Sequence, residues 1–350
     1  MRKKVIRYAF VAMFIGITLF LLQRLLVPKY TGDIVEGALV AEYYEEKTNH
    51  DVLFVGDCEV YENFSPIKLW EEYGITSYIR GSAQQLIWQS YYLLEDALRY
   101  EKPKVVVFNV LAMKYDQPQS EAYNRMTLDG MRWSKSKVDA INASMCEDEN
   151  FLSYVFPLLR YHSRWNDLNA DDIKYMFSSK KVSHNGYYMR VDTKATDNIP
   201  EGKALSNYNF SENSYKYLDK MVKLCKDNGI ELVLVKAPSL YPYWYEQWDE
   251  QMKEYAEKNE IAYINLLDST EEAGIDFKED TYDGGLHMNL SGAEKLTDYF
   301  GKWMKLRYDL ADHRSEEEYK KVYDEKVAFY NEMKTDQYKE LETYGKIVSY

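Results

Sequence analysis

Hydrophobic and polar positions follow two patterns along most of this chain. Short runs that are apolar throughout are typical of buried strands, and they occupy residues 51–56, 75–79, 104–110, 231–237 and 261–266. The segments between them carry apolar residues at helical spacing. Strand alternating with helix predicts a parallel sheet covered on both faces. The expected fold class is therefore α/β, a three-layer α/β/α flavodoxin-like domain with about five strands.

Punctuating residues set several of the expected helix boundaries. Ser65 followed by Pro66 is a typical helix start and predicts a helix through Tyr73. Gly229 predicts the end of a helix that begins near residue 214. Two further helices are expected over residues 246–258 and 291–308.

Two regions do not follow the strand–helix alternation. Residues 111–211 contain no strand-like apolar run, so we expect an inserted, mainly helical subdomain that lines one wall of a cleft. The tail is dense in Glu, Lys and Tyr and predicts one or two solvated amphipathic helices. The expected organisation is listed from the N-terminus: a tip and transmembrane anchor at 1–30, a stalk or lead-in helix at 31–50, the α/β domain with its insertion at 51–310, and a charged helical tail at 311–350.

The N-terminus is long and apolar enough to cross a membrane. No charge occurs from Tyr8 to Gln23, and the apolar stretch extends from Val5 to Val27 if Arg7 and Arg24 direct their charges to the two surfaces, which is roughly 34 Å of helix at about 1.5 Å per residue. The basic residues before it place the N-terminus in the cytoplasm and the body outside. No small-x-small cleavage site follows, so we favour an uncleaved single-pass anchor in the cell membrane over a cleaved signal peptide.

Charge and composition exclude several classes of protein. The chain has 57 acidic and 44 basic residues, and six of the basic residues lie within the first 30, which leaves a net charge of −19 on residues 31–350. That balance argues against nucleic-acid binding. The three cysteines have no C-x-x-C spacing, which argues against zinc and against a disulfide framework. The 34 tyrosines suit wet or sugar-facing surfaces.

Candidate chemistry gathers where the predicted strands end. Gly56-Asp57-Cys58 follows the first strand, Gly81 follows the second, and Asn109 ends the third. The loop before the helix at 291–308 reads YDGGLHMNLSGAEKL and contains Asp283 and His287. Because ligands bind at the carboxyl ends of parallel strands, these residues are expected to meet.

VLFVGDCEVYENFSP and YDGGLHMNLSGAEKL resemble the first and last sequence blocks of the SGNH/GDSL hydrolases. The chain is most similar to membrane-anchored envelope members, such as the teichoic-acid D-alanine transfer and alginate acetylation proteins. The resemblance covers about residues 51–110 and 229–308. It departs from the family at Cys58, where the family has Ser, and at Asp283, which precedes His287 by four residues where the family usually has three.

The resemblance implies a Cys-His-Asp triad. His287 would take the proton from Cys58, Asp283 would fix the His tautomer, and backbone N–H groups of Cys58 and Gly81 with the Asn109 amide would bind the oxyanion. No cofactor is implied. Asp57 is a further candidate for substrate binding. Each residue also has a structural interpretation: a core cysteine, a capping histidine, a turn glycine, and an asparagine bonded to loop backbone.

An aromatic loop, SLYPYWYEQW, follows the fourth predicted strand. Tyr241, Tyr243 and Trp244 could form a platform for a sugar ring, or else a packed aromatic lid. The combined expectation is an ester hydrolase or O-acyltransferase acting on a cell-envelope or exported polysaccharide, with a membrane acyl-transfer protein as a further partner. The alternative is a catalytically silent scaffold or glycan-binding protein of the same fold.

Overall fold

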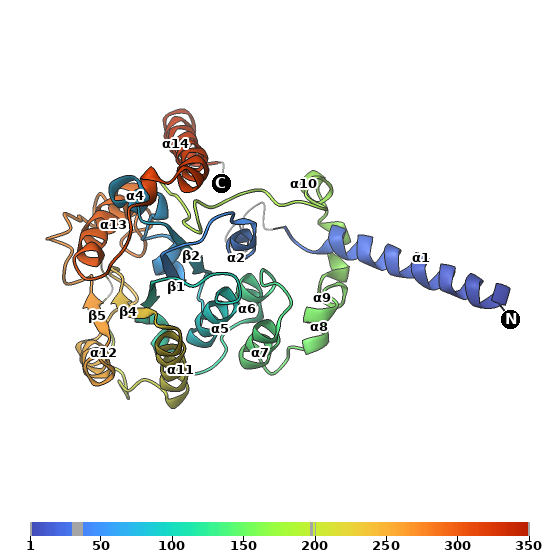
Figure 1. Ribbon diagram of the computed structural model, residues 1–350, viewed down its shortest axis with the longest axis horizontal. Coiled ribbons are helices and arrows are strands. Elements are labelled where there is room, and N and C mark those ends of the chain that lie inside the picture. Colours follow the sequence, from blue (N-terminus) through green and yellow to red (C-terminus); the bar gives the residue numbers. More distant parts are fainter. Residues whose placement is uncertain (1, 30–37, 197–198, 200, 349–350) are drawn as a thin grey trace.

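A five-stranded parallel sheet with the strand order β2-β1-β3-β4-β5 forms the centre of the molecule (Figure 1). The structure, a computed structural model, describes residues 2–29, 38–196, 199 and 201–348. The strands are β1 (Val52–Gly56), β2 (Ser77–Gly81), β3 (Val105–Asn109), β4 (Glu231–Lys236) and β5 (Ala262–Asn265). Every neighbouring pair is parallel. This order is the flavodoxin-like one, so the predicted fold class is confirmed.

Each face of the sheet has its own hydrophobic core. Successive side chains of a strand point to opposite faces, so Leu53 and Val55 of β1 join one core and Val52 and Phe54 join the other. The first core is covered by α5 (Ile87–Ala97), α7 (Lys135–Ser144), α11 (Glu212–Asn228) and α12 (Glu246–Asn259), and the second by α4 (Pro66–Tyr73), α13 (Leu290–Lys305) and α14 (Glu317–Tyr344) (Figure 1).

The helix boundaries read from the sequence have a clear physical basis in α4. Ser65 Oγ accepts a hydrogen bond from the backbone N–H of Lys68, which caps the first turn. The helix ends at Gly74, which adopts a left-handed φ of +66°. A side chain at that position would collide with Asp312, so glycine is required there for two reasons.

The insertion between β3 and α11 begins as helices and continues as an extended segment. Its helical part comprises η3 (Val110–Lys114), α6 (Glu121–Leu128), α7, α8 (Phe151–Val155), α9 (Leu158–Tyr161), η4 (His162–Asn166) and α10 (Ala170–Lys174). Residues 182–191 are mostly buried and run along the edge strand β2, where the Ile79 N–H donates to the Asn185 carbonyl at 2.9 Å. The extended half therefore covers an edge that would otherwise be open.

The region expected to form a stalk differs from the expectation over its described part. Residues 30–37 lie outside the described residues, but α2 (Leu39–Glu42) and η2 (Tyr43–Glu45) pack into the body with Leu39, Val40 and Tyr43 buried. The Glu42 carboxylate is also buried and accepts hydrogen bonds from the backbone of Val182 and Ser183. Burial raises the pKa of Glu42 to about 7, against these hydrogen bonds.

Before this region, α1 (Arg2–Leu26) projects away from the body (Figure 1). It is the one helix in the described part of the chain that is long and apolar enough to cross a membrane.

The tail forms one long helix, α14, after the short η5 (His313–Ser315), and it is more than a solvated appendage. Tyr323 is fully buried and stacks on Trp70 of α4, with ring centroids 4.1 Å apart. Further along the helix, the Gln337 amide donates to the Met189 carbonyl and accepts from the Val191 N–H. The tail thus holds α4 and the extended part of the insertion in place.

We expect Tyr323→Ala to lower the free energy of unfolding of the full chain in detergent by about 3–5 kcal/mol, because it opens a cavity against Trp70. Tyr338→Ala is a matched control, since Tyr338 belongs to the same helix but is 45% exposed, and should cost about 0.5 kcal/mol or less. Equal losses in chemical denaturation would contradict the packing of α14 described here.

Candidate active site

Cys58 stands at the first turn after β1, at the carboxyl edge of the sheet. Asp57 caps this short helix, α3 (Cys58–Tyr61), by accepting a hydrogen bond from the Glu59 N–H at 3.2 Å. The thiol is half-buried and not part of a disulfide. It therefore occupies the strand-to-helix position expected from the sequence.

The loop that carries His287 is folded tightly by glycine. Gly284 and Gly285 adopt φ values of +87° and +100°, which residues with side chains rarely adopt. This turn brings the Asp283 carboxylate back onto its own loop, where Oδ1 accepts from the N–H groups of Leu286 at 3.1 Å and His287 at 2.9 Å. Oδ2 lies 2.7 Å from His287 Nδ1. The four-residue spacing is thus compatible with an Asp–His pair.

A second carboxylate faces the same ring nitrogen. Glu62 follows α3 by one residue, and its Oε2 lies 3.6 Å from His287 Nδ1. The Tyr282 hydroxyl donates to Glu62, while the Tyr282 ring lies nearly parallel to the imidazole at an angle of 19°. Arg190 covers the Tyr282 ring, with the guanidinium carbon 4.5 Å from the ring centroid. The imidazole is therefore held by two carboxylates and one aromatic face.

These contacts change the titration of the site. Burial alone would lower the pKa of His287, but Glu62, Cys58 and the hydrogen bond to Asp283 together raise this pKa well above its usual 6.5. Burial raises the pKa of the Cys58 thiol, and His287 opposes that rise. The pKa of Asp283 is lowered: burial opposes the shift, but the hydrogen bond with His287 and the charge of the ring outweigh it. Asp283 is thus an anion that accepts the Nδ1 proton.

The second ring nitrogen of His287, Nε2, is the one that can exchange a proton with a neighbouring group. With Nδ1 bonded to Asp283, the buried Nε2 is the ring nitrogen left to interact with the Cys58 thiol. The Cys58 thiol is near enough to shift the pKa of the ring, and the ring in turn lowers the pKa of the thiol. The structure therefore brings Cys58, His287 and Asp283 into one site, with Nε2 free to exchange a proton.

Asn109 belongs to a buried polar network beneath this site. Its Nδ2 donates to Asp57 Oδ1 and to Glu59 Oε2, both at 3.0 Å, and its Oδ1 accepts from the Ala237 N–H at 3.1 Å. Both amide hydrogens are used, so the predicted oxyanion role of Asn109 would require one of these bonds to break. Burial and the charge of Glu59 raise the pKa of Asp57 to about 6. Asp57 thus contributes to the network and the helix cap.

Gly81 lies beside Gly56 in the paired register of β1 and β2. A Cβ at Gly81 would come within 3.1 Å of the Gly56 carbonyl oxygen and 3.2 Å of the Tyr61 ring. Close packing of the two strand ends therefore favours glycine at this position, whatever its N–H binds. Its contribution to an oxyanion hole stays a prediction.

The structure separates the aromatic loop residues into two groups. Tyr241 lies at the site, where its hydroxyl donates to the Asp283 carbonyl at 2.8 Å. Tyr243 is 49% exposed and is available to a ligand. Trp244 is buried, packs against Phe210 and Trp248, and donates to Asp249. Its position matches the packed aromatic alternative, so a sugar platform here would rely on the two tyrosines.

Sequence reasoning missed Glu62, Tyr282 and Lys114. Glu62 could have been found from its position four residues after Cys58, which is about one helical turn. Lys114 ends η3, and burial lowers its pKa against the opposing charges of Asp57, Glu59 and Cys58. No sequence pattern marks Lys114 or Tyr282, because only the folded loops bring them to the thiol and the ring.

Comparisons with known proteins add a distant likeness. No protein-family model matches the chain, and no curated protein matches it. A presumed acylhydrolase from Bacteroides fragilis is 13% identical, with a TM-score of 0.37 and coverage of 76% of this chain and 94% of that one. A GDSL-like lipase from Bacteroides thetaiotaomicron is 12% identical, with a TM-score of 0.32 and coverage of 73% and 88%. At these values the site geometry must carry the functional argument.

Removing either carboxylate should lower the pKa of His287, because both favour the protonated ring. We expect Glu62→Gln and Asp283→Asn each to move the titration of the His287 ring to lower pH in NMR spectra of the full chain. Between pH 6.5 and the raised pKa, the ring is then charged in the parent protein and more often neutral in the variants. Glu72→Gln, which removes an exposed carboxylate on α4, should leave the titration unchanged. An unchanged titration in Glu62→Gln would show that Glu62 does not act on the ring.

Proposed function

We propose that this chain is a membrane-anchored, SGNH/GDSL-like acyl-ester hydrolase or O-acyltransferase that uses Cys58 as its nucleophile. The observation that carries the proposal is the arrangement at His287. Nδ1 is bonded to an ionised Asp283 at 2.7 Å, and Nε2 is left for the thiol of Cys58, whose interaction with the ring shifts the pKa of both groups. This is the arrangement that a nucleophile, a base and an orienting carboxylate require.

The reaction would proceed in two steps. The thiol proton first passes to Nε2, as the raised pKa of the ring favours, and the Cys58 thiolate then attacks the acyl carbonyl carbon, so that a C–S bond forms and the carbonyl oxygen becomes an oxyanion. The imidazolium then gives its proton to the departing alcohol oxygen as the ester C–O bond breaks, which leaves an acyl thioester on Cys58. Water or a sugar hydroxyl attacks this thioester with the same nitrogen as base, and the thiol is restored.

The local charges support this order of events. An imidazolium is stabilised by Asp283 and Glu62, so the proton taken from the thiol has a favourable place to stay. Lys114 adds a positive charge near Cys58 and could stabilise the oxyanion while the Asn109 amide is bonded elsewhere. The exposed Tyr243 and the neighbouring Tyr241 are consistent with a glycan as the alcohol component.

The cellular setting is part of the proposal. With α1 as a single-pass anchor, its basic N-terminus would lie in the cytoplasm and the active site outside, where envelope polysaccharides are found. A membrane acyl-transfer protein could supply the acyl group.

Trapping the thioester tests the proposal. We expect the full chain, incubated with p-nitrophenyl acetate, to gain one acetyl group on Cys58 that hydroxylamine removes, as detected by peptide mass spectrometry. Cys58→Ala and His287→Ala should abolish acylation and ester turnover to a similar extent, since nucleophile and base act as a unit. Asp283→Asn should cost less, because Glu62 still faces Nδ1.

Cys146→Ala is the control, because Cys146 is another half-buried free thiol and lies outside the site. It should acylate at Cys58 as the parent does. If Cys58 is never acylated and no variant changes ester turnover, the chain is better described as a silent scaffold or glycan-binding protein of this fold.

A further inference from the structure

The helices α8, α9, η4 and α10 form a row beside the root of α1, and α1 extends away from this row (Figure 1). This part of the insertion exposes large apolar side chains to an unusual degree. The following are between 52% and 69% exposed: Leu152, Phe156, Leu159, Trp165, Ile173 and Phe177. Exposed apolar side chains gathered on neighbouring helices are typical of an interaction surface.

The root of α1 is fixed to the same row by side-chain bonds. The Arg164 guanidinium donates to the Leu26 carbonyl at 2.7 Å, which caps the end of α1 with a positive charge. In return, Arg24 Nε donates to the Met176 carbonyl at 2.7 Å, and its guanidinium lies 5.9 Å from the centre of the Phe177 ring. The direction of α1 relative to the row is therefore set by contacts at two places.

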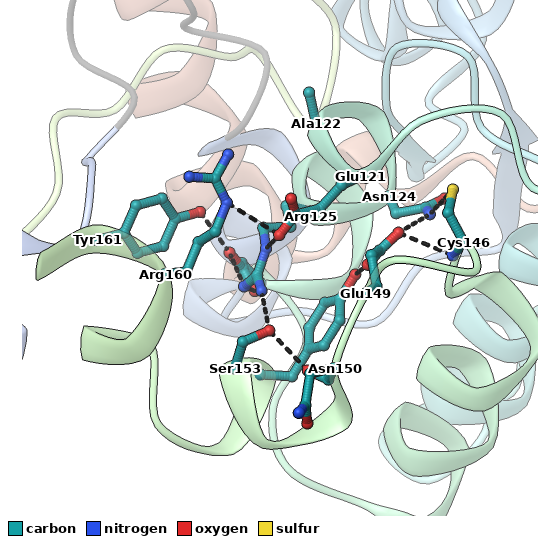
Figure 2. A network of polar contacts seen from close by, with 12 residues as sticks. Glu121, Ala122, Asn124, Arg125, Cys146, Glu149, Asn150, Ser153, Arg160 and Tyr161 are labelled. Carbon is teal, nitrogen blue, oxygen red and sulfur yellow. Dashed lines mark hydrogen bonds and ion pairs between the residues drawn. The ribbon is translucent and has the colours of Figure 1, made fainter. Parts of the chain in front are cut away.

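The row is also fastened to the rest of the insertion. Figure 2 shows Arg125 of α6 bonded to Glu121 on its own helix and to Ser153 of α8, the latter at 2.6 Å. Arg160 of α9 reaches the same Glu121 at 2.9 Å, and the Tyr161 hydroxyl donates to Asp129 at 3.1 Å. These bonds hold the helices that carry the exposed apolar residues in place against α6. We call residues 151–177, which include α8, α9, η4 and α10, the platform.

The exposure of residues along α1 indicates that the surface of the bilayer would lie at the platform. Residues 2–21 are exposed along their whole length, and the following residues are partly buried against the body. The charge-free run of α1 ends at Gln23, and the next residue, Arg24, donates to the Met176 carbonyl beside the row. The apolar row therefore lies at the level where α1 would leave the hydrocarbon.

Charge agrees with contact to lipid. Residues 31–350 carry −19 in all, yet residues 151–181 contain five basic and three acidic side chains. Basic and aromatic residues together are typical of helices that lie in a membrane interface. The platform is an exception to the acidic surface that would otherwise be repelled by anionic headgroups.

We propose that α8–α10 lie in the interface of the leaflet from which α1 emerges, so that the protein contacts the bilayer at two places. The inference rests on the proposed anchoring by α1, but not on the proposed catalysis. It would fix the orientation of the body over the membrane, where a single helix would let it swivel.

Tryptophan quenching tests this with the full chain in vesicles of phosphatidylcholine and phosphatidylglycerol, using lipid brominated near the carboxyl end of its acyl chains. Ile173→Trp and Leu306→Trp are a matched pair, since both replace an exposed aliphatic residue, 69% and 84% exposed respectively. Relative to the parent emission, we expect the added tryptophan to be strongly quenched at position 173 and unquenched at position 306. Phe14→Trp in α1 reports anchoring separately and should be quenched.

Quenching at position 14 without quenching at position 173 would overturn the docking of the platform while leaving the anchor intact. A transmembrane protein would then be the better occupant of the apolar row. The absence of quenching at both positions would overturn the anchor and the docking together. Equal quenching at positions 173 and 306 would also contradict the proposal, because it would place no preferred face of the body on the membrane.

Discussion

A buried ion pair holds the carboxyl edge of the sheet together, and the candidate site depends on it. Lys236 at the end of β4 is fully buried, and its ammonium lies 2.9 Å and 3.0 Å from the two carboxylate oxygens of Glu59. A charge in that position needs a partner, since removal of one member of a buried pair typically costs about 3–5 kcal/mol. Glu59 is the residue after Cys58, so the pair fixes the thiol-bearing turn after β1 to the end of β4, which lies two strands away in the sheet.

The pair also explains the role of the polar residues around it. Ser239 donates to Glu59 at 2.5 Å, and Asn109 joins Glu59, Asp57 and Ala237. Loops after β1, β3 and β4 are thereby tied at one point. The network positions the loops but does not itself react. The candidate reacting groups are the thiol on α3 and the imidazole on the loop before α13. Cys58 is therefore held rigidly by the network, whereas His287, its proton acceptor, belongs to a separate loop.

The sheet could be predicted because burial leaves a direct mark on sequence. KVVVFNV and ELVLVKA are apolar on both faces, as only strands with helices on both sides can be. The ends of the strands then indicated where Cys58, Asp283 and His287 would meet. Glu62 was less visible, because a glutamate near a helix end is ordinary on a surface, and only the fold places it against His287. The segment around Glu42 was misjudged for the same reason: its polar residues are buried through bonds to Val182 and Ser183, far along the chain.

The most direct measurement of the central pair is the pH dependence of Cys58 alkylation by iodoacetamide, compared between the parent chain and His287→Ala. Only the thiolate reacts, so the midpoint of the rate profile reports the pKa of Cys58. His287 lowers that pKa against the effect of burial, so the midpoint should move to higher pH when the ring is removed. Identical profiles for the two proteins would contradict the pairing of Cys58 with His287, and with it the nucleophile proposed for this site.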